Sequence, residues 1–160
     1  MLTQFIIFSA QYLHLVIFGV AVVFVLLKLS ADKKHLLATG VVASFIALLL
    51  DKVLNQIIQS PRPFIVEKVT PLFSHVADNG FPSEHTLFVM IIAGVIFIYH
   101  RKAGVFFGVL ALWVGLTRVI AKVHHFTDIL GSIAIVIVAV TISWYLLAWL
   151  KRKNIHNSLY

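Results

Sequence analysis

The stretch FPSEHTLFVMIIAGVIFIY, residues 81–99, joins a short polar segment directly to an apolar run. Pro82 can occupy the first turn of a helix, where its missing N–H group costs nothing. The N–H groups around Ser83 and Glu84 would then lack partners within the helix, and the helix dipole would help them to attract an anion. The apolar run that follows fits a membrane helix. The stretch therefore predicts a membrane helix whose first turn carries a polar site.

The composition places the rest of the chain in a membrane as well. Of the 160 residues, 61% are hydrophobic and only 12% are charged, and the mean hydropathy is +1.01. A soluble domain of this length would need more polar surface, and the length predicts a single domain over residues 1–160. The chain contains no Cys, which excludes disulfides, thiolate metal sites and Cys nucleophiles.

Five apolar runs are candidates for membrane helices, each of which needs about 20 mostly apolar residues. We predict an all-α, polytopic transmembrane bundle of five to six membrane helices, with a short irregular segment on the outer face. Residues 1–12 belong either to the first span or to a separate piece at the membrane interface. The five runs are residues 5–27, 36–58, 84–99, 103–121 and 127–150.

The net charge of +7, from 13 Lys and Arg against 6 Asp and Glu, is better explained by membrane topology than by nucleic-acid binding. Most basic residues form clusters between or after the apolar runs, as in cytoplasmic loops. With five spans, three such clusters fall on one side of the cytoplasmic membrane, so we expect the N-terminus outside and the C-terminus inside. The clusters are Lys28 with Lys33 and Lys34, Arg101 with Lys102, and Lys151 with Arg152 and Lys153.

Three polar stretches would then meet on the outer side. The segment of residues 59–83 holds all four prolines and is expected to be mostly non-helical. Taken singly, each polar side chain has a simpler explanation, such as an arginine that reaches lipid headgroups or a helix cap. Ionisable groups at membrane depth are costly, however, so their convergence favours a functional site. The stretches are QSPRPF with Arg62, FPSEH with Ser83 and His85, and TRVIAKVHHFTD with Arg118, His124 and Asp128.

The chemistry of these side chains suits a phosphate group. Guanidinium forks match phosphate oxygens. His124 and Asp128 are four residues apart, so on a helix they share a face. The carboxylate can hold one imidazole nitrogen and leave the other free to attack, while His85 can donate a proton to a leaving oxygen. No metal or other cofactor is needed, and the carboxylates form no recognisable metal-binding run.

The spacing of Arg118 and His124 makes a prediction about the backbone. The two residues are six apart, which is about 240° of rotation on an ideal helix, so they would not share a face. For both to contact one phosphate, the helix must break between them. We therefore predict a break within residues 119–124.

These stretches resemble the three motifs of the type 2 phosphatidic acid phosphatase (PAP2) family of membrane lipid phosphatases, and most closely its BcrC-type undecaprenyl-diphosphate phosphatases. The third motif is Ser-Arg, five residues, His, three residues and Asp, and here Thr117 replaces the serine. The second is Pro-Ser-Gly-His, with Glu84 in place of glycine. The first is Lys, six residues and Arg-Pro. Asn55 stands at its lysine position, and Lys52 lies one helical turn earlier.

The resemblance implies a role for each matching residue. His124 would attack the terminal phosphorus to give a phosphohistidine, Asp128 would orient it, and His85 would protonate the leaving phosphate. Arg62, Ser83 and Arg118 would hold the transferred group, with Asn55, Lys52 and Glu84 as further candidates for substrate contacts. The resemblance assigns no role to His125 or Lys122, for which we expect contacts at the surface or with lipid headgroups.

The resemblance favours a polyprenyl diphosphate such as undecaprenyl diphosphate as the substrate, in an outer-face site beside lipid. Phosphatidate and phosphatidylglycerol phosphate are alternatives of the same class. A haem-binding protein is a different class, suggested by six histidines. It is weakened because His35 and His100 would lie on the side away from His85 and His124. A transporter is a third reading, weakened because the ionisable residues gather at one face.

Overall fold

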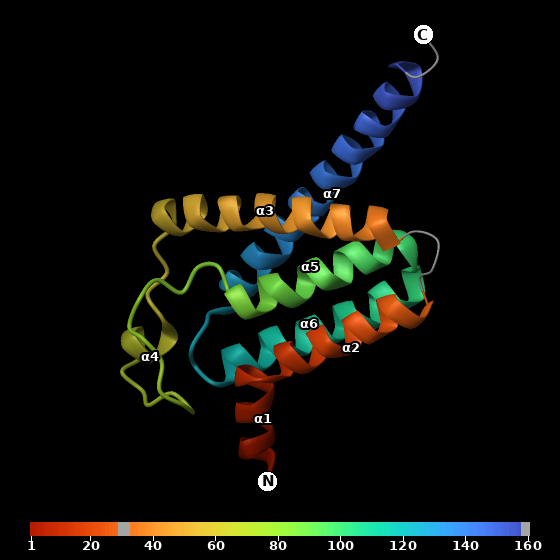
Figure 1. Ribbon diagram of the computed structural model, residues 1–160. Helices are drawn as coiled ribbons and strands as arrows, with labels where there is room; N and C mark the ends of the chain where they lie inside the picture. Colours follow the sequence, from red (N-terminus) through yellow and green to blue (C-terminus); the bar gives the residue numbers. More distant parts are fainter. Residues whose placement is uncertain (29–32, 158–160) are drawn as a thin grey trace.

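The computed structural model describes residues 1–28 and 33–157, and within those ranges it consists of helices and irregular segments without a strand ladder (Figure 1). The predicted all-α bundle is therefore confirmed. The last four apolar runs each correspond to one helix, with bounds that differ by a few residues at most ends. The helices are α1 (Leu2–Gln11), α2 (Leu13–Lys28), α3 (Lys33–Ile57), α4 (Pro63–Val66), α5 (Glu84–Tyr99), α6 (Arg101–Ile120) and α7 (Phe126–Asn157).

The first apolar run is divided into two helices. α1 and α2 meet at Tyr12 with a bend of 61°, and α1 points away from the bundle (Figure 1). The N-terminal residues thus form a helix distinct from α2, and their placement at the membrane interface stays a prediction. Hydrogen bonds to α6 help to hold α1 in place. The Trp113 indole N–H donates to the Ser9 hydroxyl at 3.3 Å, and the Arg118 guanidinium donates to the Ala10 carbonyl at 3.2 Å.

The helix α5 forms the centre of the bundle, packed against α2, α3, α6 and α7. Its sequence is apolar on nearly every side, and such a helix is stable only when other helices or lipid surround it. α6 approaches α5 very closely at Gly104, where an added Cβ would lie 2.3 Å from the backbone of Phe97. Most large apolar side chains on the outside of α3 and α7 remain exposed, which fits contact with lipid.

By helix length and apolar composition, fewer than five segments qualify as membrane spans. α3, α6 and α7 are long and apolar enough to cross a membrane, and α1 with α2 would make a fourth, bent span. α5 is apolar but has only 16 residues. Because α5 lies inside the bundle, its polar start can meet a water-filled pocket rather than lipid. The predicted count of five to six spans stays a prediction.

The segment between α3 and α5 covers one end of the bundle, which we call the α4 end (Figure 1). It contains one short helix, α4, and is otherwise irregular, as its prolines predict. An isolated antiparallel bridge between Pro61 and Asn79 closes its base. The predicted break before His124 also lies at this end. α6 ends at Ile120, and Lys122 adopts a φ of 63°, which turns the chain toward α7.

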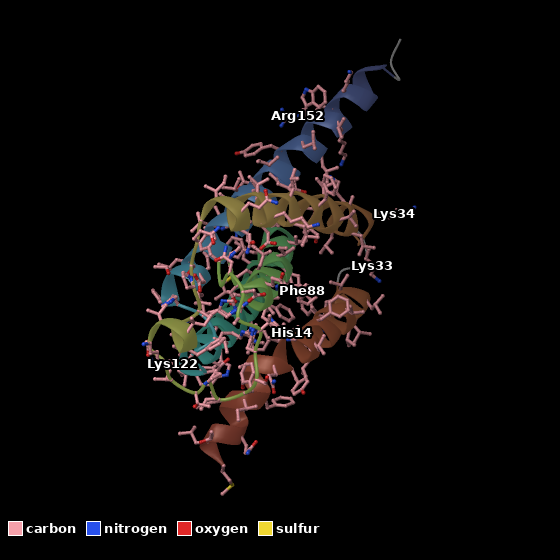
Figure 2. All side chains as sticks on the ribbon, turned by 90° about the vertical axis from the view of Figure 1, so that its left-hand side faces the viewer. His14, Lys33, Lys34, Phe88, Lys122 and Arg152 are labelled. Carbon is pink, nitrogen blue, oxygen red and sulfur yellow. The ribbon has the colours of Figure 1, made fainter. Side chains whose placement is uncertain are left out.

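The basic clusters lie at the other end of the bundle. α2 ends at Lys28, α3 begins at Lys33 and α6 begins at Arg101, and all three helix termini point away from α4 (Figure 1). Arg152 of α7 lies beyond the bundle (Figure 2). Residues 29–32, between Lys28 and Lys33, lie outside the described residues.

Candidate active site

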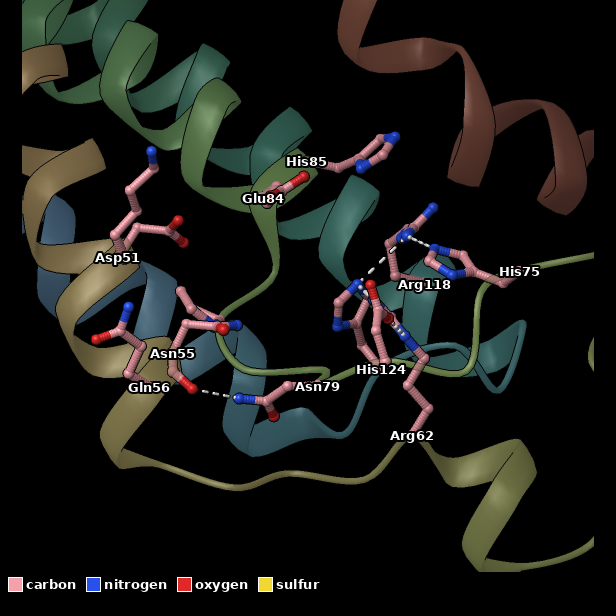
Figure 3. A pocket seen from close by; sticks show the side chains of 13 residues that line it. Asp51, Asn55, Gln56, Arg62, His75, Asn79, Glu84, His85, Arg118 and His124 are labelled. Atoms are coloured by element: carbon pink, nitrogen blue, oxygen red, sulfur yellow. Dashed lines mark hydrogen bonds and ion pairs between the residues drawn. The ribbon is translucent and has the colours of Figure 1, made fainter.

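A cavity of about 520 Å³ opens at the α4 end of the bundle. It lies between the C-terminal part of α3, the first turn of α5, the end of α6 and the segment before α5 (Figure 3). Four of the residues that the sequence predicted for one phosphate site line it together. These are Arg62, His85, Arg118 and His124, and the other lining residues are Asp51, Lys52, Asn55, Gln56, His75, Asp78, Asn79, Pro82 and Glu84.

His124 lies in the turn between α6 and α7 and is almost fully buried. Its Nδ1 is 2.9 Å from the carbonyl oxygen of Gly80. Because a carbonyl oxygen only accepts, Nδ1 carries the hydrogen, and Nε2 keeps its lone pair. That lone pair faces the cavity. The contact to Gly80 therefore selects the tautomer that a nucleophilic imidazole requires.

Two buried arginines face Nε2 of His124. Nη1 of Arg62 and Nη2 of Arg118 each lie 3.3 Å from it, and the two residues are only 5% and 2% exposed. Arg62 is held by a donated hydrogen bond to the Val123 carbonyl at 2.7 Å and by an ion pair with Asp78 at 2.7 Å. The break after α6 brings Arg118 and His124 together in spite of their six-residue spacing.

Asp128 is fully buried at the start of α7. Its Oδ2 lies 3.4 Å from Nδ1 of His124, which is farther than the Gly80 carbonyl. The carboxylate also accepts from the Ser60 hydroxyl and from the His125 backbone N–H, both at 2.8 Å. Asp128 thus supports His124 electrostatically and fixes the turn, while the shorter hydrogen bond to His124 comes from Gly80.

Two residues at the start of α5 line the cavity, and the residue before them does not. His85 and Glu84 line it, whereas Ser83 does not. The Ser83 hydroxyl lies 3.0 Å from that of Thr86, and its backbone N–H donates to the Asp128 carbonyl. The predicted phosphate contact of Ser83 therefore finds no support in this arrangement. Glu84 forms no ion pair with an arginine among the described residues.

Comparison with known proteins identifies the family. Residues 36–152 match the PAP2 superfamily. The chain belongs to the PAP2 superfamily. The matched region includes all three polar stretches, so the predicted resemblance is confirmed.

Relatives and solved structures agree with this PAP2 membership. The chain is 30% identical over 147 residues to the "Bacitracin transport permease protein BcrC" of Bacillus licheniformis, covering 90% of this chain and 71% of that protein. It is also 30% identical over 107 residues to the "Undecaprenyl-diphosphatase BcrC" of Bacillus subtilis, covering 67% of this chain and only 55% of that protein. The crystal structure of Aquifex aeolicus LpxE is similar with a TM-score of 0.72 and 25% identity, covering 90% of this chain and 86% of that one.

The α3 wall of the cavity includes Asn55, which stands at the lysine position of the first PAP2 motif. Asn55, at the lysine position, donates its side-chain amide to the Phe81 carbonyl at 2.6 Å, so it holds the segment before α5. Lys52 lines the cavity one helical turn earlier and makes no hydrogen bond or ion pair with the described part of the chain. Of Lys52 and Asn55, Lys52 therefore has the side chain that is free to contact a ligand in the cavity.

Some residues near the PAP2 motifs could not be found from the sequence. His75 and Asp78 come from the proline-rich segment and contact Arg118 and Arg62. His14 of α2 packs its ring against that of His85, with centroids 4.3 Å apart, and lies beside Phe88 (Figure 2). Only their residue types and their predicted placement on the same side of the membrane as the motifs could have suggested them. His125 and Lys122 do not line the cavity, and they contact Pro61 and Glu67 instead.

Burial and the charges in this PAP2 site shift the pKa of several of its side chains. Burial lowers the pKa of His124 from 6.5 to about 4; the nearby Asp128 opposes this shift, and the two arginines add to it. Burial, Arg62 and Arg118 also lower the pKa of His75. For Asp78, burial alone would raise the pKa of the carboxyl, but the hydrogen bond and the charge of Arg62 outweigh it and lower the pKa. The positive charges of Arg62 and Arg118 in the cavity thus favour the binding of an anion.

Proposed function

We propose that this PAP2 protein is a phosphatase that removes the terminal phosphate of a polyprenyl diphosphate, of the undecaprenyl type, to give the monophosphate and inorganic phosphate. One observation carries the proposal. The imidazole lone pair of His124 faces the cavity between two buried guanidinium groups, at 3.3 Å from each. Guanidinium pairs bind phosphate oxygens, and a neutral imidazole between them can attack the phosphorus.

In the first step, Nε2 of His124 forms a bond to the terminal phosphorus. The bond between that phosphorus and the bridging oxygen breaks, and its electron pair leaves on the lipid monophosphate. His85, at the cavity wall, takes up a proton when the negatively charged diphosphate binds and donates that proton to the leaving oxygen. Arg62 and Arg118 neutralise the charge on the equatorial oxygens. The Gly80 carbonyl and Asp128 stabilise the positive charge that develops on the His124 ring.

In the second step, water attacks the phosphorus of the phosphohistidine. His85 accepts a proton from this water, the P–N bond breaks, and its electron pair returns to His124. Inorganic phosphate then leaves the two arginines. Both steps use only groups of this chain, so we propose that the reaction needs no metal ion.

Several features favour a lipid as the substrate. Large apolar side chains cover the outer surface of the helices. An apolar cavity of about 610 Å³ between α2, α3 and α5 begins at Phe88, close to His14 and His85, and has room for part of a hydrocarbon tail. The name of the Bacillus subtilis relative favours a polyprenyl diphosphate. Phosphatidate or phosphatidylglycerol phosphate is the second candidate, because the two arginines would bind any terminal phosphate.

A transport function is the competing proposal, because the Bacillus licheniformis relative is named as a permease. The buried charges argue against it, since they gather at the α4 end instead of forming a path through the bilayer. The haem proposal is disfavoured because His35 and His100 lie near the other end of the bundle.

Phosphate release from a panel of lipid phosphates and diphosphates tests the proposal. In detergent, the wild type should release phosphate fastest from polyprenyl diphosphate, with and without EDTA, and vanadate should inhibit it. His124→Ala should reduce the rate at least about 1,000-fold, as loss of a nucleophile does. The matched control is His125→Gln, the neighbouring imidazole outside the cavity, which should stay within about twofold of the wild type.

Three outcomes would each contradict a part of the proposal. Turnover by folded His124→Ala at the wild-type rate would remove His124 from the nucleophile role. Loss of activity in EDTA, restored by a divalent ion, would replace the metal-free mechanism. Faster hydrolysis of phosphatidate than of polyprenyl diphosphate would keep the phosphatase but exchange its substrate.

A further inference from the structure

We propose that His75 is a phosphate-binding residue, which takes up a proton when an oxyanion enters the cavity and then donates a hydrogen bond to that oxyanion through Nε2. The inference rests on the proposed phosphatase function and adds a specific ligand to its site. His75 belongs to none of the three sequence motifs.

The position of His75 supports a contact with the oxyanion. It lies on the segment before α5, lines the cavity, and its ring centroid is 6.3 Å from that of His124. Nη2 of Arg118 lies 2.8 Å from Nε2 of His75 and 3.3 Å from Nε2 of His124 (Figure 3). One guanidinium nitrogen thus contacts both imidazoles, and a phosphate bound to that nitrogen would lie beside His75.

The hydrogen bonds define the protonation state of His75 in the cavity without an anion. A guanidinium group only donates, so Nε2 of His75 must accept and carries no hydrogen. Nδ1 lies 3.3 Å from the Val76 carbonyl oxygen, which suits an N–H at that nitrogen. His75 is therefore neutral, and its lone pair is used by Arg118.

The surroundings of His75 explain why this state changes when an anion binds. Burial and the two arginines lower the pKa of His75, which keeps the ring neutral. Among the described residues, the carboxylate that acts on His75 is that of Asp78, which is already paired with Arg62. The charged and titratable groups around the ring are Arg118 of α6, Arg62 before α4, His124 of the α6–α7 turn, His85 of α5 and Asp78 of its own segment.

A bound oxyanion opposes the effect of the two arginines on His75 and takes over the hydrogen bond from Arg118. An anion oxygen competes for Nη2 of Arg118, so Nε2 of His75 loses its donor. The negative charge now favours the imidazolium form, and the added N–H can donate to the anion. His75 would then supply a third cationic ligand next to the two arginines. Lys52 is the rival for this role, and it lies on the opposite wall formed by α3.

The test uses tungstate, a tetrahedral dianion whose own charge stays constant near neutral pH. Its Kd is measured by calorimetry on detergent-solubilised protein from about pH 6.5 to pH 9. Wild-type affinity should fall about tenfold as the pH rises through this range. His75→Asn should bind about tenfold more weakly at pH 6.5 and depend less on pH. His75→Lys carries a permanent charge, so it should bind tightly over the whole range.

His125→Asn is the matched control for the loss of an imidazole on the same face, and it should reproduce the wild-type pH dependence. Melting curves of each variant exclude unfolding. The proposal is overturned if folded His75→Asn keeps the wild-type affinity and pH dependence, or if Lys52→Ala alone produces the loss. If the wild type binds tungstate in this His75-dependent way but hydrolyses no lipid phosphate, the phosphatase proposal fails and the oxyanion ligand stands.

Discussion

At the scale of single residues, His124 shows how one buried side chain links catalysis to stability. The imidazole is 3% exposed, and its pKa of about 4 lies below the ordinary value of 6.5. In the folded protein it therefore stays neutral to a lower pH than in the unfolded chain. Between these two values the unfolded state binds the extra proton, so this residue makes the fold less stable as the pH falls.

This linkage gives a measurable prediction. The pKa shift of His124 from 6.5 to about 4 corresponds to roughly 3 kcal/mol of stability that is present at pH 7 and lost by about pH 4. We expect the melting temperature of the wild type to fall more steeply over this range than that of His124→Gln, which does not titrate. Parallel curves for the two proteins would show that His124 is not protonated on unfolding.

The residues of the site were predictable to different degrees. Arg62, Arg118, His85 and His124 could be predicted because fixed spacing within short motifs reflects chemistry that the residue types reveal. The contact of His75 with Arg118 joins residues 43 positions apart, and no pattern along the chain encodes it. The Ser83 hydroxyl was expected in the cavity, but Thr86, three residues later, offers it a partner within the helix.

At the scale of the helices, apolar runs and prolines predicted most of the bounds, whereas the bend at Tyr12 could not be located. Neither proline nor glycine marks this position, so no local signal breaks the helix there. The contacts of Ser9 and Ala10 with α6 accompany the new direction of α1. Tertiary contacts of this kind are invisible to a periodicity argument.

The close pair of α5 and α6 offers a test with an internal control. At Gly104, a Cβ would lie 2.3 Å from the Phe97 backbone, whereas at Gly108, one turn later on α6, it would meet nothing within 4 Å. Gly104→Ala should therefore lower the stability by about 1–3 kcal/mol through overpacking. Gly108→Ala should be neutral or stabilising by up to about 1 kcal/mol. Equal melting temperatures for the two variants would mean that α5 and α6 are less tightly packed.

At the scale of the whole molecule, charge divides the bundle into two ends. Three basic clusters lie away from the cavity, and such clusters are enriched in the cytoplasmic loops of membrane proteins. We therefore propose that the cavity opens on the extracytoplasmic side of the cell membrane. The separation of the basic clusters from the cavity could be predicted from the sequence, because it depends on the number of Lys and Arg residues between apolar runs rather than on detailed contacts.

The absence of cysteine from the chain allows this orientation to be tested cleanly. Ser74→Cys places one thiol on the exposed segment at the α4 end, and Lys102→Cys places one at the start of α6. In intact cells, a membrane-impermeant maleimide should label Ser74→Cys, and should label Lys102→Cys only after permeabilisation. The unchanged protein controls for background labelling. The reverse pattern would place the cavity on the cytoplasmic side.

The hydrogen bond from Arg118 to the Ala10 carbonyl has a consequence for biosynthesis. Ala10 is synthesised 108 residues before Arg118, and domains can fold only after their parts exist. The contact of α1 with α6 can therefore form only after nearly three quarters of the polypeptide has been translated. A nascent chain stalled before that point would reside in the bilayer without a competent phosphate pocket, so the enzyme can become active only late in its own synthesis.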